Sequence, residues 1–102
     1  MLFRSAVIGA LSFVGGMHAL GMHCGRLSTL QQETERERIR KEWVASGKIS
    51  AANFDAMYRV ILDGTAKRIQ ANPQQAQQGC AQYEAMQAQG LKAAQALGLS
   101  KP

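Results

Sequence analysis

The chain has 102 residues, of which 46% are hydrophobic, but it contains only three Phe, two Tyr and one Trp. A chain of this length forms at most one domain, and its thin core predicts a covalent staple. The formal net charge is +5, yet the basic residues are scattered or alternate with acids, and no aromatic residues are interleaved with them. This pattern argues against a nucleic-acid partner.

The N-terminal segment has the pattern of a signal peptide. Arg4 supplies a short basic start, the residues after it are apolar, and no further charged residue occurs before Arg26. Small residues at Ala19 and Gly21 suit the two positions that a signal peptidase requires. We therefore predict that residues 1–21 are a signal peptide and that cleavage follows Gly21.

The alternative for this segment is an uncleaved membrane anchor. The apolar run from Ala6 to Met22 is shorter than the ~20 residues that a full span needs, and Gly15, Gly16 and His18 interrupt it. Because Arg4 favours a cytoplasmic N-terminus, both hypotheses place the rest of the chain in the periplasm or cell envelope.

Cys24 follows this segment directly, and lipid attachment, metal binding and a disulfide are its three candidate roles. Lipid attachment requires a small residue immediately before the cysteine and a Leu-like residue three before it, whereas His23 and Gly21 occupy these positions. The spacing of His18 and His23 matches no known ligand pattern, and cleavage would remove His18. We therefore expect no metal and no other cofactor, and we assign Cys24 to a disulfide.

The first helix predicted in the remaining chain covers residues 28–46. Ser28 suits the N-cap position, and Gly47 lies just beyond the last helical residues. Residues 33–42 alternate Glu with Arg and Lys at helical spacing, which is typical of a solvated, self-paired helix face.

The apolar residues of this helix do not form a single stripe. Leu27 and Leu30 project on one side, and Ile39 and Trp43 project on another. As the only Trp of the chain, Trp43 is a candidate core residue and a candidate interaction residue.

The second helix, residues 51–71 with Ser50 as its cap, has a clear apolar stripe. We predict it as the principal core helix. Tyr58, which is followed by the polar Arg59, is a second candidate interaction residue. The stripe consists of Phe54, Met57, Tyr58, Ile61, Leu62, Thr65, Ala66 and Ile69.

The third helix is predicted over residues 73–97. Asn72 and Pro73 form a compact helix start, since Pro is favoured at the first helical position and disfavours helical geometry in the residue before it. Small residues along the helix, including Gly79 and Gly90, permit a neighbouring helix to approach closely. Residues 98–102 are expected to form a frayed tail.

These elements predict an all-α fold, a small three-helix up-down-up bundle over residues 22–97. In such a bundle the first and third helices begin at the same end. Cys24 lies just before the first helix and Cys80 near the start of the third, and an even cysteine count in an exported chain favours a disulfide. We predict a Cys24–Cys80 disulfide that contributes ~4 kcal/mol in the chain-entropy model.

No catalytic motif occurs in the sequence, so we do not expect an enzyme. Both histidines lie in the first quarter of the chain, and neither a nucleophile motif nor a phosphate-binding glycine loop is present. The sequence favours an exported helical binding or accessory protein, of the holdase or inhibitor type, with a protein partner. The alternative is a single-span, membrane-anchored accessory subunit of an envelope complex.

Overall fold

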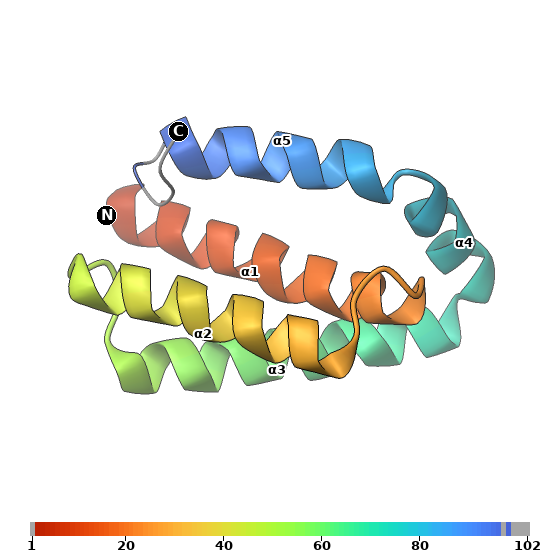
Figure 1. The fold of residues 1–102 in the computed structure, drawn as a ribbon, viewed down its shortest axis with the longest axis horizontal. Coiled ribbons are helices and arrows are strands. Elements are labelled where there is room, and N and C mark those ends of the chain that lie inside the picture. The colour runs from red at the N-terminus through yellow and green to blue at the C-terminus, as the bar shows by residue number, and fades with distance from the viewer. Residues whose placement is uncertain (1, 97, 99–102) are drawn as a thin grey trace.

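The computed structural model describes the backbone of residues 2–96 and 98 and the side chains of residues 6–96. These residues form five helices and no strand (Figure 1). The fold is therefore all-helical, as predicted. The helices are α1 (Leu2–His23), α2 (Thr29–Ala45), α3 (Ala51–Ala71), α4 (Pro73–Ala81) and α5 (Tyr83–Ala96).

Helix α1 lies in the middle of the bundle. It packs against each of the other four helices, most extensively against α3 and then against α5 (Figure 1). Besides two buried glycines, five of its residues are at most 7% exposed: Val7, Leu11, Met17, His18 and Ala19. The predicted three-helix bundle is not confirmed, because α1 lies among the helices that were expected to form it.

The apolar stretch Ala6–His23 is long and apolar enough to cross a membrane. Core helices of soluble proteins and signal sequences share this property, and 44% of the stretch is buried within the bundle. An N-terminal apolar helix of this kind is compatible with export and with a membrane location.

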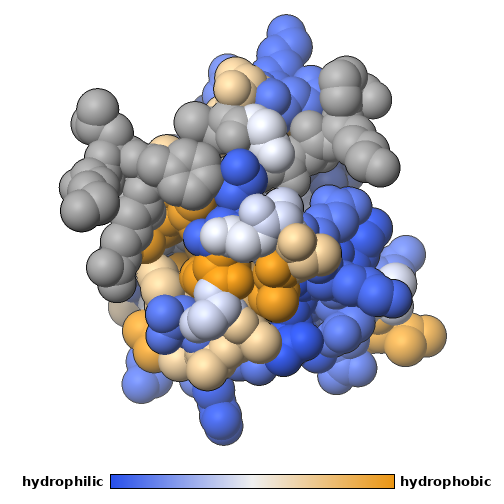
Figure 2. Space-filling model, turned by 90° about the vertical axis from the view of Figure 1, so that its left-hand side faces the viewer, coloured by the Kyte–Doolittle hydropathy of each residue, from blue (hydrophilic) through white to orange (hydrophobic). Residues whose placement is uncertain are grey.

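The core joins α1, α2 and α3 through aromatic packing. Phe54 is fully buried, its ring meets the edge of Trp43 at a centroid distance of 6.0 Å, and it stacks on Tyr58 at 5.9 Å. Val7 and Leu11 of α1 complete this cluster. Seen from the end of the molecule where α1 begins and α5 ends, hydrophobic side chains gather in the middle, between hydrophilic ones (Figure 2).

The predicted caps explain where α2 and α3 begin and end. The Ser28 hydroxyl accepts a hydrogen bond from the Gln31 backbone, and the Gln31 side chain accepts one from the Ser28 backbone. Ser50 accepts from the Asn53 backbone in the same way. Gly47 follows α2 with φ +73°, a left-handed conformation that favours glycine.

The predicted third helix is interrupted at Gln82, which separates α4 from α5. Gly79 lowers helix propensity just before the break. The disulfide holds the following residue, Cys80, beside the end of α1. Because α5 then lies along α1, the chain changes direction between α4 and α5 (Figure 1). Leu97, the predicted last helical residue, lies outside the described residues, as do residues 99–102 of the predicted tail.

The predicted disulfide is confirmed. Cys24 and Cys80 are bonded, with their Cα atoms 5.6 Å apart. Cys24 directly follows α1, and its backbone N–H still bonds to the Leu20 carbonyl. The bond therefore joins the C-terminal end of the central helix to the last turn of α4.

Candidate functional site

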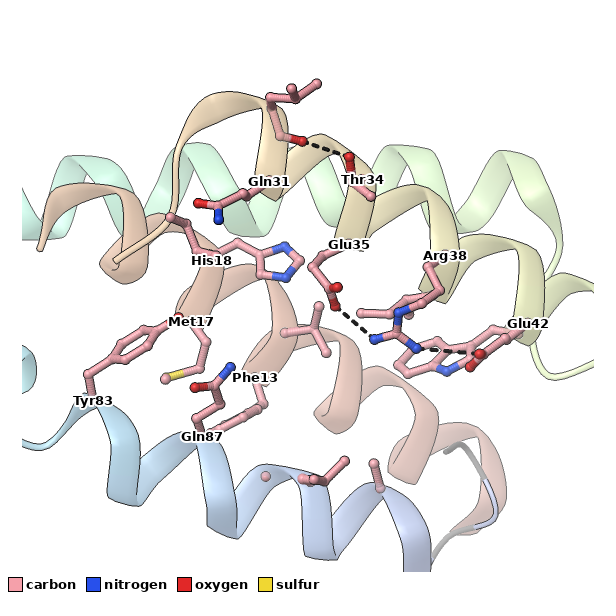
Figure 3. A pocket seen from close by; sticks show the side chains of 18 residues that line it. Phe13, Met17, His18, Gln31, Thr34, Glu35, Arg38, Glu42, Tyr83 and Gln87 are labelled. Carbon is pink, nitrogen blue, oxygen red and sulfur yellow. Dashed lines mark hydrogen bonds and ion pairs between the residues drawn. The ribbon is translucent and has the colours of Figure 1, made fainter. Parts of the chain in front are cut away.

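An open groove lies between α2 and α5. Both helices pack on α1, but within the described part of the chain they do not pack on each other. The groove has a volume of about 540 Å³. Its floor is formed by Phe13, Val14, Met17 and His18 of α1. The side chains of Phe13, Met17 and His18 lie between the two outer helices (Figure 3).

Both walls of the groove carry apolar side chains among polar ones. Two leucines remain exposed on them: Leu30 on α2 is 73% exposed and Leu91 on α5 is 51% exposed. Exposed large apolar side chains that line a concave surface are typical of a binding site. The α2 wall includes Leu30, Gln31, Thr34, Glu35, Arg38, Ile39, Glu42 and Trp43, and the α5 wall includes Tyr83, Gln87, Gly90, Leu91 and Ala94.

The charges of the groove lie on its α2 wall. Arg38 donates to Glu35 at 2.7 Å and to Glu42 at 3.4 Å (Figure 3). The hydrogen bond to Glu35 is the main reason that the pKa of Arg38 is raised. With two acids and one arginine among the lining residues, the groove carries a net charge of −1, and its α5 wall is uncharged.

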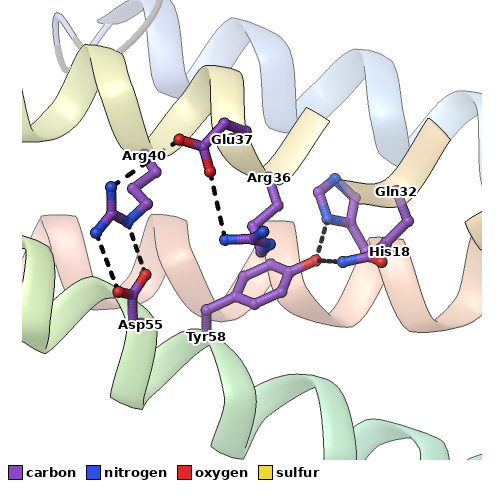
Figure 4. Close-up of polar contacts among 7 residues, drawn as sticks. All are labelled: His18, Gln32, Arg36, Glu37, Arg40, Asp55 and Tyr58. Atoms are coloured by element: carbon purple, nitrogen blue, oxygen red, sulfur yellow. Dashed lines mark hydrogen bonds and ion pairs between the residues drawn. The ribbon is translucent and has the colours of Figure 1, made fainter. Parts of the chain in front are cut away.

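A buried polar network lies beneath the α2 wall and joins three helices (Figure 4). It consists of His18 on α1, Tyr58 on α3 and Gln32 on α2, and we call it the His18 network. The Tyr58 hydroxyl lies 2.6 Å from Nδ1 of His18, and Nε2 of Gln32 donates to that hydroxyl at 2.5 Å. Burial lowers the pKa of His18, while the nearby carboxylate of Glu35 opposes this shift.

A second tie holds α2 to α3 near the other end of α2. Arg40 donates from Nε and Nη2 to the two carboxylate oxygens of Asp55, at 2.8 and 3.1 Å (Figure 4). This hydrogen bonding lowers the pKa of Asp55. The self-pairing predicted for residues 33–42 is observed between Glu35 and Arg38, but the ion pair from Arg40 to Asp55 crosses between helices and was not predicted.

The groove is held together at the disulfide end. Arg26, in the loop before α2, forms an ion pair with Glu84 on α5. Beside it, the Tyr83 hydroxyl lies so close to Gly21 that a Cβ on this glycine would be 2.8 Å away. With the Cys24–Cys80 bond, these contacts tie the start of α5 to the end of α1.

The residues predicted as site residues from the sequence lie at different depths relative to the groove. Trp43 is 3% exposed and belongs both to the core and to the α2 wall. Tyr58 is also 3% exposed and lies beneath the groove in the His18 network. Cys24 is held in the disulfide, and the described residues contain no group of three side chains that could hold a metal ion.

Sequence reasoning missed the groove itself because its floor belongs to α1, the segment interpreted as a leader or an anchor. The one available signal was the split apolar surface of α2, which has Leu30 on one side and Trp43 on another.

Comparison of the chain with protein-family models, with curated proteins and with solved structures finds no match.

Proposed function

We propose that this protein is an exported, non-catalytic binding protein of the cell envelope, and that its groove takes an amphipathic helix of a partner protein. The observation that carries this proposal is the placement of α2 and α5 on α1 without contact between them. A mostly apolar floor lies between them, where one more helix would complete the bundle. Helix-in-groove recognition uses surfaces of this kind.

The dimensions and chemistry of the groove favour a helix as its occupant. On α2 the lining residues run from Leu30 to Trp43, which corresponds to ~20 Å, or between three and four helical turns. Three of the four floor residues are apolar, whereas polar side chains such as Thr34 and Gln87 lie along the two walls. This favours an occupant with one apolar face, and the net charge of −1 favours a basic residue alongside α2.

This function requires α1 to stay in the mature protein. Removal of residues 1–21 remains a prediction, but it would take away the groove floor and would expose Phe54, which packs in one cluster with Val7 and Leu11. We therefore propose that α1 is retained as the central helix of the domain.

The proposed location rests on the disulfide. A bond between Cys24 and Cys80 persists in an oxidising compartment, which the periplasm and the cell envelope provide. The disulfide also ties α4 to the end of α1, next to the start of α5, so oxidation supports the geometry of the proposed site.

A membrane-anchored accessory subunit is the second candidate function. It is supported by the length and apolarity of Ala6–His23. In that arrangement α1 would leave the bundle, and the buried side chains of Leu11 and Phe54 would lose each other as neighbours. The groove would not exist, so the two functions predict different binding surfaces.

Site-specific photo-cross-linking distinguishes these functions. A photoreactive amino acid is placed at Leu30 in the groove or, as a matched control, at Val60 on α3, because both side chains are 73% exposed. In the native envelope we expect Leu30 to cross-link to an amphipathic helical segment of one protein and Val60 not to do so. Cross-links to lipid acyl chains, or equal capture by both positions, would contradict the proposal.

A further inference from the structure

We infer that His18 makes the groove sensitive to pH: when this side chain takes up a proton, the joint between α1, α2 and α3 breaks and the α2 wall moves outward. This inference concerns the regulation of the proposed binding groove, and its biological use rests on that proposed function. The opening itself can be measured without any partner.

The hydrogen bonds around Tyr58 favour one protonation state of His18. The Gln32 amide nitrogen that faces the Tyr58 hydroxyl can only donate, so the hydroxyl oxygen accepts from Gln32 (Figure 4). Among the contacts of the described residues, the acceptor for the single hydroxyl proton is Nδ1 of His18, 2.6 Å away. We therefore assign His18 the neutral form with its ring proton on Nε2, because this tautomer gives the Tyr58 proton an acceptor.

A second proton on His18 destabilises this network. Nδ1 would become a donor, so His18 and Gln32 would both direct a hydrogen at the Tyr58 oxygen. The hydroxyl proton of Tyr58 would lose its acceptor, and His18, which is only 7% exposed, would carry a buried positive charge. An unsatisfied buried donor and a buried charge both disfavour the closed arrangement.

The charged groups around His18 do not remove this penalty. Glu35 on α2 favours the protonated form, but Arg38, the partner of Glu35, disfavours it. From α3 the facing group is the Tyr58 hydroxyl, and from α5 the titratable side chain that lines the same groove is Tyr83. Burial is the largest influence on His18, and it keeps the pKa of this side chain below its ordinary value.

Helix α2 is the element that this change releases. It packs only on α1 and α3 among the described helices, and both contacts are small compared with the contact between α1 and α3. Near its start the His18 network ties it down through Gln32, and near its end Arg40 and Trp43 hold it. Loss of the tie at Gln32 frees the half of α2 that carries Leu30, so the groove widens there.

The direction of the pH response follows from linkage. The open arrangement lets His18 reach water and titrate near its ordinary pKa of ~6.5, whereas the closed arrangement favours the neutral form. Proton uptake therefore favours the open arrangement, and opening begins as the pH falls below ~6.5. The only other histidine of the chain is His23, which is exposed at the end of α1 and outside the network.

The test uses the full oxidised chain and the apolar dye 8-anilinonaphthalene-1-sulfonate between pH 7.5 and 4.5, with far-UV circular dichroism recorded in parallel. The wild type and His23→Asn should show a several-fold rise in dye fluorescence as the pH falls through about 6 to 5, with helicity retained. His18→Asn should stay flat, because its amide oxygen can accept the Tyr58 proton but does not titrate.

Three results would overturn the inference: no rise in the wild type, a rise that persists in His18→Asn, or a rise that accompanies loss of helicity. If His18→Asn does not fold, nitrogen NMR of the wild-type histidine rings replaces it. We expect the Nε2–H tautomer of His18 at pH 7.5 and a titration midpoint that coincides with the dye transition. The opposite tautomer, or a transition that follows His23, would contradict the inference.

Failure of this inference and failure of the proposed function can be told apart. The dye experiment involves no partner, so a pH response without cross-linking at Leu30 would support the pH switch and contradict the helix-binding function. Specific cross-linking at Leu30 that does not change between pH 7.5 and 5 would support the helix-binding function and contradict the switch.

Discussion

The ring of Phe13 on α1 lies directly against the backbone of Gly90 on α5, so that a Cβ added to this glycine would overlap the ring. Because α5 packs on α1 and otherwise only on α4 among the described helices, this contact sets how deeply α5 is seated. It also sets the height of one groove wall.

Replacement of Gly90 by Ala should therefore destabilise the protein, although Ala is the better helix former. Overpacking of this kind costs ~1–3 kcal/mol. This cost should exceed the ~1 kcal/mol by which Ala is favoured over Gly in the interior of a helix. Urea unfolding followed by circular dichroism measures the difference.

The matched control is Gly64→Ala in the middle of α3, where an added Cβ would meet nothing within 4 Å. This variant should be unchanged or stabilised by up to ~1 kcal/mol. Equal effects of the two substitutions would contradict the close seating of α5 on α1.

Leu11→Ala tests whether α1 belongs to the core. Leu11 is fully buried against the aromatic cluster, so its truncation should cost ~2–5 kcal/mol of unfolding free energy. Ile8→Ala, on the same helix at a side chain that is 39% exposed, should cost clearly less. If α1 does not pack in the folded domain, the two variants will unfold at the same urea concentration.

Reduction of the disulfide should lower stability by ~4 kcal/mol, since the bond closes a large loop in the unfolded chain. Cys24 and Cys80 are 56 residues apart in sequence, and both are only half-buried in the folded protein. Thermal unfolding with and without reductant measures the effect, with the Cys24→Ser, Cys80→Ser double variant as a comparison. A double variant as stable as the oxidised wild type would contradict this prediction.

The ion pair between Arg40 and Asp55 should contribute to stability only while the carboxylate is charged. Because the pKa of Asp55 is lowered from 3.8, the contribution is present above that value and is lost as the pH falls through the lowered pKa. Asp55→Asn should reduce stability at pH 6 and make little difference at pH 2, and salt should weaken its effect because the pair is exposed.

Asp63 on the same helix forms no ion pair with the described residues and provides the control. Asp63→Asn should not reproduce the pH-dependent difference. If it does, the effect belongs to the general charge of the protein and not to the pair with Arg40.

The boundaries of α3 were predictable because its signals are local. An apolar stripe at helical spacing, a capping Ser50 and Pro73 beyond its end define residues 51–71, and α3 has these bounds. The caps of α2 are equally local. The disulfide could be predicted because the expected helices bring Cys24 and Cys80 to one end of a compact helical chain.

The break at Gln82 and the role of α1 could not be predicted, because each depends on distant contacts. The break reflects the bond from Cys80 to Cys24 and the seating of α5 on Phe13. An apolar helix has the same composition whether it is a leader, a span or a core helix, so the sequence of α1 does not distinguish these roles.

The groove was not predictable for the same reason. The split apolar surface of α2 has a simple explanation in the structure, where Trp43 enters the core and Leu30 remains exposed on the groove wall. That distinction exists only once α1 lies beneath α2. The His18 network likewise needs three helices to meet, and no local spacing connects His18 with Tyr58.

The role of α1 as the central helix is tested most directly by the N-terminal sequence and intact mass of the oxidised protein isolated from its native host. We expect a protein that carries α1 in a soluble envelope fraction, with Cys24 and Cys80 bonded. A mature chain that begins at Met22 would rule out this role, because that chain has neither the groove floor nor His18.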